Sequence, residues 1–332
     1  MQTFPRDYWY IAAFGSEIER RLLARTLLST PVVLYRRRDG RVVALEDRCP
    51  HRRVSLSLGR LVDDRVQCGY HGLEFNDRGV CVRIPGQEII PPQASVRAFP
   101  VIERDSLVWI WLGEPAATDE GRIPAYPMCA DPRMAGKPMM VHVNANALFL
   151  IENVLDLSHI SFVHLSTVGS SYVAEYRAQT TVSDGLIEVT RVMNNVENPP
   201  LYKEALKFDY GDRVQKIRFW PAGNIQLHIT IAPPGVTDPR QVRNLHVMSP
   251  VTPETERSHF QFIGMYRDFD IGNDALTEFI ADQFLKTVLE DKVIIEDQQR
   301  NADVDPPGAK FISTAADKAP LAARRMLRRL AG

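Results

Sequence analysis

The chain has 332 residues, of which 45% are hydrophobic and 24% are charged. Its 40 lysines and arginines nearly balance its 41 aspartates and glutamates, so the formal net charge is −1. This balance argues against a dedicated nucleic-acid binder, which needs a strongly basic face. The length favours two domains, each with its own hydrophobic core. One basic cluster, which we interpret as a solvated tail, consists of Arg324, Arg325, Arg328 and Arg329.

Targeting signals are not evident in the sequence. Residues 1–15 lack a basic region followed by a long apolar stretch, and no apolar run reaches the roughly 18 residues that a membrane helix requires. We therefore expect no signal peptide and no membrane interaction. Four cysteines are too few for a disulfide scaffold, which favours a cytoplasmic protein in which closely spaced cysteines bind metal.

The first part of the chain, residues 31–112, is predicted to consist of short β-strands joined by tight turns. Hairpin turns are expected at 38–41 and 76–79, where polar residues and a glycine separate apolar segments. The segment 114–127 is rich in proline and has no apolar period, which is typical of a linker.

Beyond the linker the pattern predicts both helices and strands. A helix is expected over 148–164, and strands are expected over 179–193 and 215–232. A long amphipathic helix is predicted over 274–301, with Asn273 as its N-cap.

Two short motifs each combine a cysteine with a histidine. Cys49-Pro50-His51 is followed, after 16 residues, by Cys68-Gly69-Tyr70-His71, and each motif lies in a turn between predicted strands. Two thiolates and two imidazoles suit either zinc or a Rieske [2Fe–2S] cluster. Zinc fingers tend to place both cysteines in one half of the site, whereas here each half supplies one cysteine and one histidine. We therefore favour the Rieske cluster.

Further cysteines bear on the type of cluster. Rieske proteins of membrane complexes carry two more cysteines that bridge these loops, and neither loop has one here. A lower-potential, soluble type is therefore expected. The other two cysteines, Cys81 and Cys129, are interpreted as packing residues.

A second group of polar residues lies in the predicted helix 148–164. Asn153, Asp156 and His159 recur every three residues, which places them on one helix face. His164 can reach the same ion if the helix loosens near its end. Such a stripe is costly to bury without a charged partner. Two histidines with one carboxylate form the facial triad of non-haem iron(II) oxygenases.

Several acids could complete that triad: Asp156, Glu290, Asp291, Glu296 and Asp297. The apolar residues of the long helix define one face: Ile280, Phe284, Val288, Ile294 and Ile295. Asp291 falls on this face, whereas Glu290 and Asp297 point toward water. Because a buried acid needs a partner, we favour Asp291 as the ligand over the alternative, an acid paired with an arginine at the core edge.

With these motifs the chain resembles, over nearly its whole length, the oxygenase component of Rieske non-haem iron oxygenases. The tracts 9–13 (Trp-Tyr-Ile-Ala-Ala) and 252–256 (Thr-Pro-Glu-Thr-Glu) are most similar to the monooxygenase branch that includes vanillate and dicamba O-demethylases. The resemblance implies an α+β fold. An N-terminal all-β Rieske [2Fe–2S] domain, 1–115, would precede a C-terminal helix-grip-like catalytic domain, 116–332, with a seven-stranded antiparallel sheet wrapped on the long helix.

The resemblance also implies site residues by position. Cluster ligands would be Cys49 and Cys68 on one iron and His51 and His71 on the other. Ligands of the mononuclear iron(II) would be His159, His164 and Asp291. Asp156 would bridge a cluster histidine of one subunit to an iron ligand of its neighbour, because the two metals of one chain are too far apart for fast electron transfer. Asn153 would lie close to the iron without binding it.

The implied partners and reaction follow from the same resemblance. A homotrimer would receive electrons from NAD(P)H through a flavin reductase, usually with a ferredoxin. It would use O2 to hydroxylate or demethylate a small aromatic substrate, and we favour vanillate-type O-demethylation. The alternatives are N-demethylation, hydroxylation of a ring or methyl group, or a Rieske electron-transfer protein without oxygenase activity. The expected pocket residues are Leu227, Ser249 and Asp282, none of which is a natural carboxylate anchor.

Overall fold

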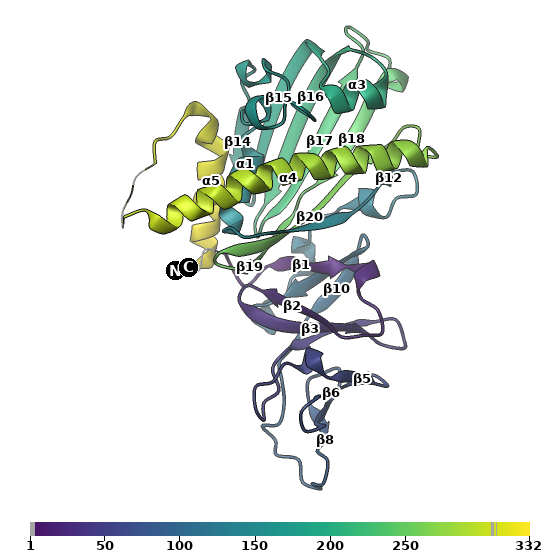
Figure 1. Cartoon of the computed structure of the whole chain (residues 1–332), viewed down its shortest axis with the longest axis vertical. Coiled ribbons are helices and arrows are strands. Elements are labelled where there is room, and N and C mark those ends of the chain that lie inside the picture. The colour runs from purple at the N-terminus through teal and green to yellow at the C-terminus, as the bar shows by residue number, and fades with distance from the viewer. Residues whose placement is uncertain (1–3, 307–308, 310) are drawn as a thin grey trace. The chain divides into compact units, whose positions relative to one another are not determined.

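The structure is a computed structural model that describes residues 4–306, 309 and 311–332. By their internal contacts these residues form two compact units (Figure 1). The N-terminal unit comprises residues 6–123 and 252–255, and the C-terminal unit comprises the rest of the described chain. The predicted domain limits, 1–115 and 116–332, stay a prediction.

The N-terminal unit contains three small antiparallel sheets. The first has the order β1 (Trp9–Phe14), β11 (Leu107–Trp111), β10 (Val101–Arg104). The second has the order β2 (Leu23–Leu27), β3 (Thr30–Arg36), β4 (Val42–Glu46), β9 (Ala98–Phe99). The third has the order β5 (Arg60–Val62), β6 (Arg65–Gln67), β7 (Glu74–Phe75), β8 (Cys81–Arg83). The predicted hairpin turns are confirmed, because they join β3 to β4 and β7 to β8.

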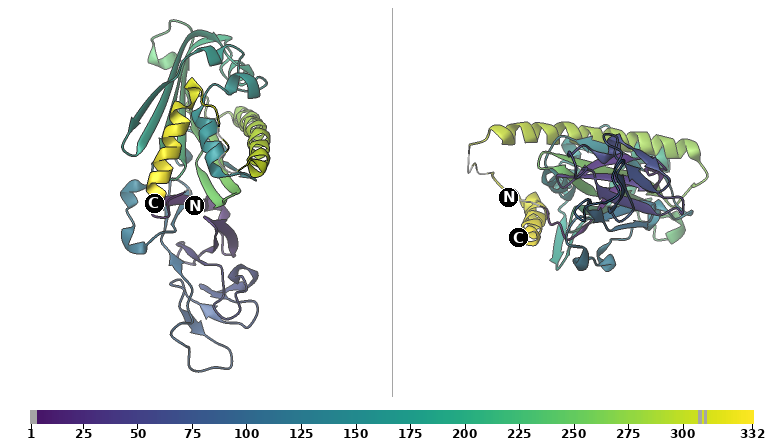
Figure 2. Two further views of the ribbon diagram at one scale, coloured as in Figure 1. Left: turned by 90° about the vertical axis from the view of Figure 1, so that its left-hand side faces the viewer. Right: turned by 90° about the horizontal axis from the view of Figure 1, so that it is seen from below.

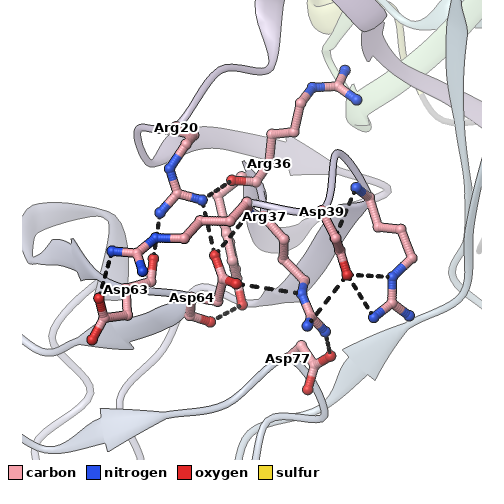
Figure 3. Close-up of polar contacts among 10 residues, drawn as sticks. Arg20, Arg36, Arg37, Asp39, Asp63, Asp64 and Asp77 are labelled. Atoms are coloured by element: carbon pink, nitrogen blue, oxygen red, sulfur yellow. Dashed lines mark hydrogen bonds and ion pairs between the residues drawn. The ribbon is translucent and has the colours of Figure 1, made fainter.

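A network of ion pairs ties three turns of this unit together (Figure 3). The Arg37 guanidinium, in the β3–β4 turn, contacts the carboxylate of Asp77 in the β7–β8 turn. Arg37 also lies 3.4 Å from Asp39 and 3.8 Å from Asp64, which belongs to the β5–β6 turn. Arg20 adds an ion pair of 2.8 Å to Asp64.

The position of these three turns matters for the two Cys-His loops. β4 leads from the first turn toward Cys49, and β6 leads from the second turn to Cys68. β7 follows the Cys68 loop and ends at the third turn. The network therefore joins the strand ends that lie opposite the two loops.

The C-terminal unit is built on a large antiparallel sheet. Its strands follow the order β12-β20-β18-β17-β16-β15-β14, and β13 also pairs with β20. Their bounds are β12 (Ala135–Gly136), β13 (Met139–Val143), β14 (Gln179–Ser183), β15 (Leu186–Glu197), β16 (Tyr210–Trp220), β17 (Asn224–Ala232), β18 (Arg243–Met248) and β20 (Ser258–Arg267). In β19 (Val251–Thr255), Val251 belongs to the C-terminal unit and the other four residues belong to the N-terminal unit. The predicted fold class is confirmed.

Five α-helices belong to the described part of this unit: α1 (Ala147–Leu155), α2 (Ile160–Val163), α3 (Pro200–Leu206), α4 (Asp274–Val304) and α5 (Lys318–Ala331). Single 3₁₀ turns occur along the chain at Gly15–Glu17, Leu56–Leu58, Pro115–Ala117, Glu120–Arg122, Pro127–Cys129, Val173–Glu175, Pro239–Gln241 and Ala315–Asp317. None of the helices described has the length and apolar character that crossing a membrane requires.

The long helix α4 crosses one face of the sheet (Figure 1). The predicted N-cap is confirmed, since the Asn273 side chain accepts a hydrogen bond of 3.0 Å from the Leu276 N–H. The predicted core face is confirmed except at Ile294, which is 50% exposed, while the adjacent Ile295 is buried. Successive helix positions differ by about 100°, so the two side chains cannot both face the sheet.

The prediction of one helix over 148–164 is wrong. α1 ends at Leu155, Asp156 has extended backbone angles, and α2 begins only at Ile160. The Asp156 carboxylate accepts hydrogen bonds from the Ser158 N–H at 2.8 Å and hydroxyl at 2.6 Å. Such a local side-chain turn competes with helical hydrogen bonding. Asn153, Asp156 and His159 therefore do not share a helix face.

The C-terminal helix also differs from its prediction. α5 packs against α1, which lies between α5 and α4 (Figure 2). Arg324 donates from Nε and Nη2 to the two carboxylate oxygens of Glu152, both at 2.6 Å. The interpretation of the arginines as a solvated tail is thus wrong for Arg324, although the other three are exposed.

We expect Glu152→Gln to lower the free energy of unfolding by about 1 to 3 kcal/mol, because it leaves the half-buried Arg324 without its charged, two-point partner. Urea denaturation followed by circular dichroism measures the change. Arg329→Gln is the control, since Arg329 contacts a fully exposed Asp184 at 3.5 Å and its loss should cost less than about 0.5 kcal/mol. Equal effects of the two variants would contradict a specific role for the Arg324 pair.

Candidate metal centres

Three potential ligand atoms converge beside α4 in the C-terminal unit. His159 Nε2 and His164 Nε2 are 3.2 Å apart, and Asp291 Oδ1 lies 3.6 Å from the first and 3.1 Å from the second. Among the described residues, these three form a group whose ligand atoms all lie within 4.8 Å of one another. Asp291 forms no ion pair with a lysine or arginine of the described chain, so the alternative of an acid paired with an arginine is not what the structure shows.

Both imidazoles are anchored at Nδ1. His159 Nδ1 contacts the backbone carbonyl of Asp156, and His164 Nδ1 lies 2.8 Å from Glu290 Oε2. Acceptors at Nδ1 favour the tautomer with the proton on that atom, which leaves the Nε2 lone pair free for a cation. The two Nε2 atoms therefore point at one place as electron-pair donors.

Asn153 holds the carboxylate of this group. Its Nδ2 donates a hydrogen bond of 3.0 Å to Asp291 Oδ1, while its own Oδ1 is buried and has no hydrogen-bond partner among the residues that the structure describes. An unpaired buried acceptor beside a carboxylate is costly unless a positive charge is near. Two imidazoles, one carboxylate and an orphaned amide oxygen fit a divalent cation, and two histidines with one carboxylate match non-haem iron(II).

The two imidazoles differ in their electrostatic surroundings. Burial lowers the pKa of His159. Burial also opposes protonation of His164, but hydrogen bonds and attraction from Asp291 and Glu290 outweigh it and raise the pKa of that imidazole. A cation at this place therefore competes with a proton for His164.

Glu290 belongs to the site, contrary to the prediction that it points toward water. Besides His164, it accepts hydrogen bonds from the hydroxyls of Ser166 at 2.8 Å and Thr167 at 3.3 Å. These partners lie in a segment remote in sequence, so the helical period of α4 alone could not reveal them. The two hydroxyl residues that directly follow the His164-Leu165 pair are the only sequence signal.

The other candidate acids lie elsewhere. The Asp156 carboxylate binds Ser158, that of Glu296 binds the Asn144 N–H at 2.9 Å, and that of Asp297 pairs with Arg300 at 2.7 Å. Asp291 is thus the acid that the fold places with the two histidines.

In the N-terminal unit, the two Cys-His loops have the same backbone construction. The N–H of Cys49 donates to the carbonyl of Val54 at 2.9 Å, and that of Cys68 donates to the carbonyl of Leu73 at 2.8 Å. The fifth residue of each loop has a positive φ, 62° for Arg53 and 73° for Gly72, and its N–H returns to the cysteine carbonyl. Two unlike sequences therefore make matching loops.

The thiols and imidazoles of these loops occupy different depths. Cys49 and Cys68 are 2% and 3% exposed and are free thiols, whereas His51 and His71 are exposed, with ring centroids 4.6 Å apart. Burial raises the pKa of the Cys49 thiol, and the neighbouring Cys68 thiol adds to this effect. Buried sulfur and exposed nitrogen ligands fit a cluster that has two cysteines on one iron and two histidines on the other.

Comparison with known families decides the identity. Residues 8–100 match the Rieske [2Fe-2S] domain, and residues 143–332 match the vanillate O-demethylase oxygenase C-terminal domain. The chain belongs to the Rieske non-haem iron oxygenases. The predicted Rieske cluster and non-haem iron are thus confirmed as the cofactors of this oxygenase.

The oxygenase is similar over nearly its whole length to several oxygenase components. It is 38% identical to the toluene-4-sulfonate monooxygenase system iron-sulfur subunit of Comamonas testosteroni, across 98% of this chain and 97% of the relative. It is 36% identical to the oxygenase component of dicamba O-demethylase from Stenotrophomonas maltophilia, across 99% and 98%. The crystal structure of dicamba monooxygenase bound to 3,6-dichlorosalicylic acid superposes with a TM-score of 0.93 at 34% identity, covering 98% of this chain and 97% of that one.

A cavity of about 80 Å³ lies between the sheet and α4 and reaches the three candidate iron ligands. Leu227 and Ser249, two of the predicted pocket residues, line it, and their contact with a substrate stays a prediction. The assignment of Asp282 to the pocket is wrong, because its side chain is exposed on α4 and does not line the cavity. Polar lining residues that the sequence did not single out include Tyr202, Gln215 and Gln261.

We expect Glu290→Gln to weaken iron retention by roughly 10- to 100-fold, because the variant replaces the anionic acceptor at His164 Nδ1 with a neutral amide. Iron content after dialysis against chelators of increasing strength measures the effect. Asp282→Asn removes an exposed carboxylate from the same helix and should retain iron as the wild type does. Wild-type retention in Glu290→Gln would show that Glu290 does not support the site.

Proposed function

We propose that this oxygenase hydroxylates or oxidatively demethylates a small aromatic substrate, with O-demethylation of a methyl ether as the leading reaction. The observation that carries the proposal is the convergence of His159, His164 and Asp291 at the wall of a largely apolar cavity. Relatives named for toluene-4-sulfonate, dicamba and vanillate support an aromatic substrate. Two of these names describe O-demethylases.

The chain's own residues have three tasks in this reaction. His159, His164 and Asp291 would hold iron(II), which when bound supplies the activation of O2. Glu290, Asn153 and the Asp156 carbonyl hold these three side chains in position. Apolar lining residues such as Leu157, Ile160 and Phe284 exclude water and pack against a ring.

The overall reaction sets what must enter and leave the site. One oxygen atom of O2 is inserted into a C–H bond, and the other leaves as water after two electrons and two protons are supplied. If the carbon is an O-methyl group, the hydroxylated product is a hemiacetal that collapses to formaldehyde and a phenol. No residue has to act as a nucleophile.

Electrons for this reaction come from a separate partner. We propose an NAD(P)H-dependent flavin reductase, with or without a ferredoxin, and a cytoplasmic homotrimer in which His71 of one subunit approaches Asp156 of the next. Support comes from the place of Asp156 beside the iron ligands: it lies next to a surface hollow lined by Glu152, Gln298 and His159. An acid at such an opening is accessible to a neighbouring subunit.

We expect the purified protein to hold three irons per chain, two in the cluster and one mononuclear. Asp291→Ala should keep the visible spectrum of the cluster, lose the third iron, and reduce formaldehyde release by more than about 100-fold, because the facial triad then lacks its carboxylate. Methoxybenzoates with a surrogate reductase serve as the assay. Two irons per wild-type chain would instead indicate an electron-transfer protein, and intact turnover in Asp291→Ala would contradict the ligand assignment.

A separate variant tests the proposed role of Asp156. Asp156→Asn should keep both metal sites filled, because its amide oxygen can still accept the hydrogen bonds from Ser158 that end α1, its backbone carbonyl remains, and only the negative charge is lost. We expect the reduced cluster to be reoxidised at least about 100-fold more slowly when substrate and O2 are added, as stopped-flow absorbance would show. Loss of the cluster, or wild-type reoxidation, would argue against a bridging role.

A further inference from the structure

The cavity beside the candidate iron ligands is lined by two largely buried residues whose donor groups bond to no other described residue. Gln215 on β16 and Tyr202 on α3 line it and are 3% and 1% exposed. Within the described chain, the Gln215 side chain bonds only through its oxygen, and the Tyr202 hydroxyl makes no hydrogen bond. Because buried polar groups normally have partners, these two groups are available to a bound molecule.

The orientation of the Gln215 amide is fixed by chemistry. Arg191 Nε and Nη2 both donate to Gln215 Oε1, at 3.1 Å and 2.8 Å. A guanidinium can only donate, so the amide must present its oxygen to Arg191 and its NH₂ group to the cavity. Arg191 is itself held by the backbone carbonyls of Leu157 at 2.9 Å and Val173 at 3.2 Å. The cavity therefore receives a preoriented N–H donor.

Tyr202 has a second guanidinium behind it. Arg213 lies with its guanidinium carbon 5.5 Å from the centroid of the Tyr202 ring. Arg213 and Gln215 are alternate residues of β16 and so share one face of the sheet. Arg191 is directly opposite Gln215 on β15. The two donors and the two guanidiniums thus form one group, which we call the donor cluster.

The donor cluster contains two buried guanidiniums, and neither of them forms an ion pair among the described residues. Arg191 and Arg213 are each 1% exposed, and no carboxylate of the described residues lies within ion-pair distance of either. In the described part of the chain, Arg213 Nε and Nη2 are buried and have no hydrogen-bond partner. Burial, with repulsion from Arg213, lowers the pKa of Arg191 to about 10 in spite of attraction from the Asp156 carboxylate, so Arg191 is still charged at neutral pH. Buried unpaired cations are costly, and an anion nearby offsets that cost.

We propose that the donor cluster binds the acidic group of the substrate, so that the substrate is an aromatic carboxylate or sulfonate anchored by Gln215 and Tyr202. Arg191 and Arg213 act as positioning residues that orient the donors and supply a positive field. The inference rests on the proposed function, since it assigns a substrate class to the same cavity. Its anchor differs from the sequence-predicted positions: Leu227 is apolar, and Ser249 accepts a hydrogen bond of 3.0 Å from Gln261 Nε2.

Calorimetric titration of the anaerobic, iron-loaded oxygenase tests this proposal with matched probes. The acids are toluene-4-sulfonate and 4-methoxybenzoate, and the neutral counterparts are 4-tolyl methyl sulfone and methyl 4-methoxybenzoate. We expect the wild type to bind the acids at least about tenfold more tightly than the neutral compounds.

Two substitutions of Gln215 test the anchor itself. Gln215→Leu removes the donor, and Gln215→Glu adds a negative charge. Both should weaken acid binding by about 10-fold or more and change neutral binding by less than about threefold.

Two further variants separate the anchor from a structural role. Tyr202→Phe keeps the ring against Arg213 but removes the hydroxyl, so it should weaken acid binding selectively by about 3- to 10-fold. Gln261→Leu alters another amide of the same cavity, whose N–H is already bonded to Ser249, and should affect acids and neutral compounds equally. Iron content and circular dichroism report whether each variant is folded.

Two outcomes would overturn the proposal. One is unchanged acid selectivity in the folded Gln215 and Tyr202 variants, and the other is a wild type that binds none of the acids at 1 mM or binds the neutral compounds equally well. Failure of the proposed function has a different signature. In that case the acids bind selectively, yet no oxygenated or demethylated product forms from any compound with O2 and a reductase.

Discussion

The break between α1 and α2 is the constraint on which the iron site depends. A helix leaves its last carbonyls without partners, and at this break the carbonyl of Asp156 becomes the acceptor for His159 Nδ1. A continuous helix over 148–164 would have used that carbonyl for its own hydrogen bonding. The interruption therefore both supplies the anchor for one imidazole and turns the chain so that His164 can face the same point.

The long helix α4 completes the arrangement with two consecutive acids. Asp291 Oδ1 lies 3.1 Å from Nε2 of His164, and Glu290 Oε2 lies 2.8 Å from Nδ1 of the same ring. Neighbouring helix positions point about 100° apart, which lets one helix contact both edges of one imidazole. Asp291 lies with the two imidazole Nε2 atoms, and Glu290 fixes the ring of His164. The helix α4 thus supplies one candidate iron ligand and also the acid that orients a second one.

Local sequence spacing predicted the parts of the site that depend on short segments. The two Cys-His motifs lie within single turns, and their hydrogen bonds close within five residues. Asp291 was predicted because burial along a helix follows its period. Glu290 and the donor cluster were not, because their contacts join elements far apart in the chain. The alternation of β16 shows that Gln215 faces inward only once the pairing with Arg191 on β15 is known.

The same limits explain the errors. Residues 153, 156 and 159 do have helical spacing in the sequence, but the helix ends at Leu155, where the Asp156 carboxylate accepts a hydrogen bond from the Ser158 N–H instead. Asp282 was assigned to the pocket by position alone, whereas its place on the outer side of α4 is a property of packing. Arg324 belongs to a basic cluster, yet it pairs with an acid in α1 that no local pattern connects to it.

That pair links the end of the chain to the iron ligands. Glu152, which binds Arg324, is followed directly by Asn153, which holds the Asp291 carboxylate. α5 therefore braces the short helix from which the ligand support extends, although it contributes no residue to the triad. Removing α5 with a protease, or displacing it with a purification tag attached to it, would therefore loosen iron from a site whose ligands are all still present.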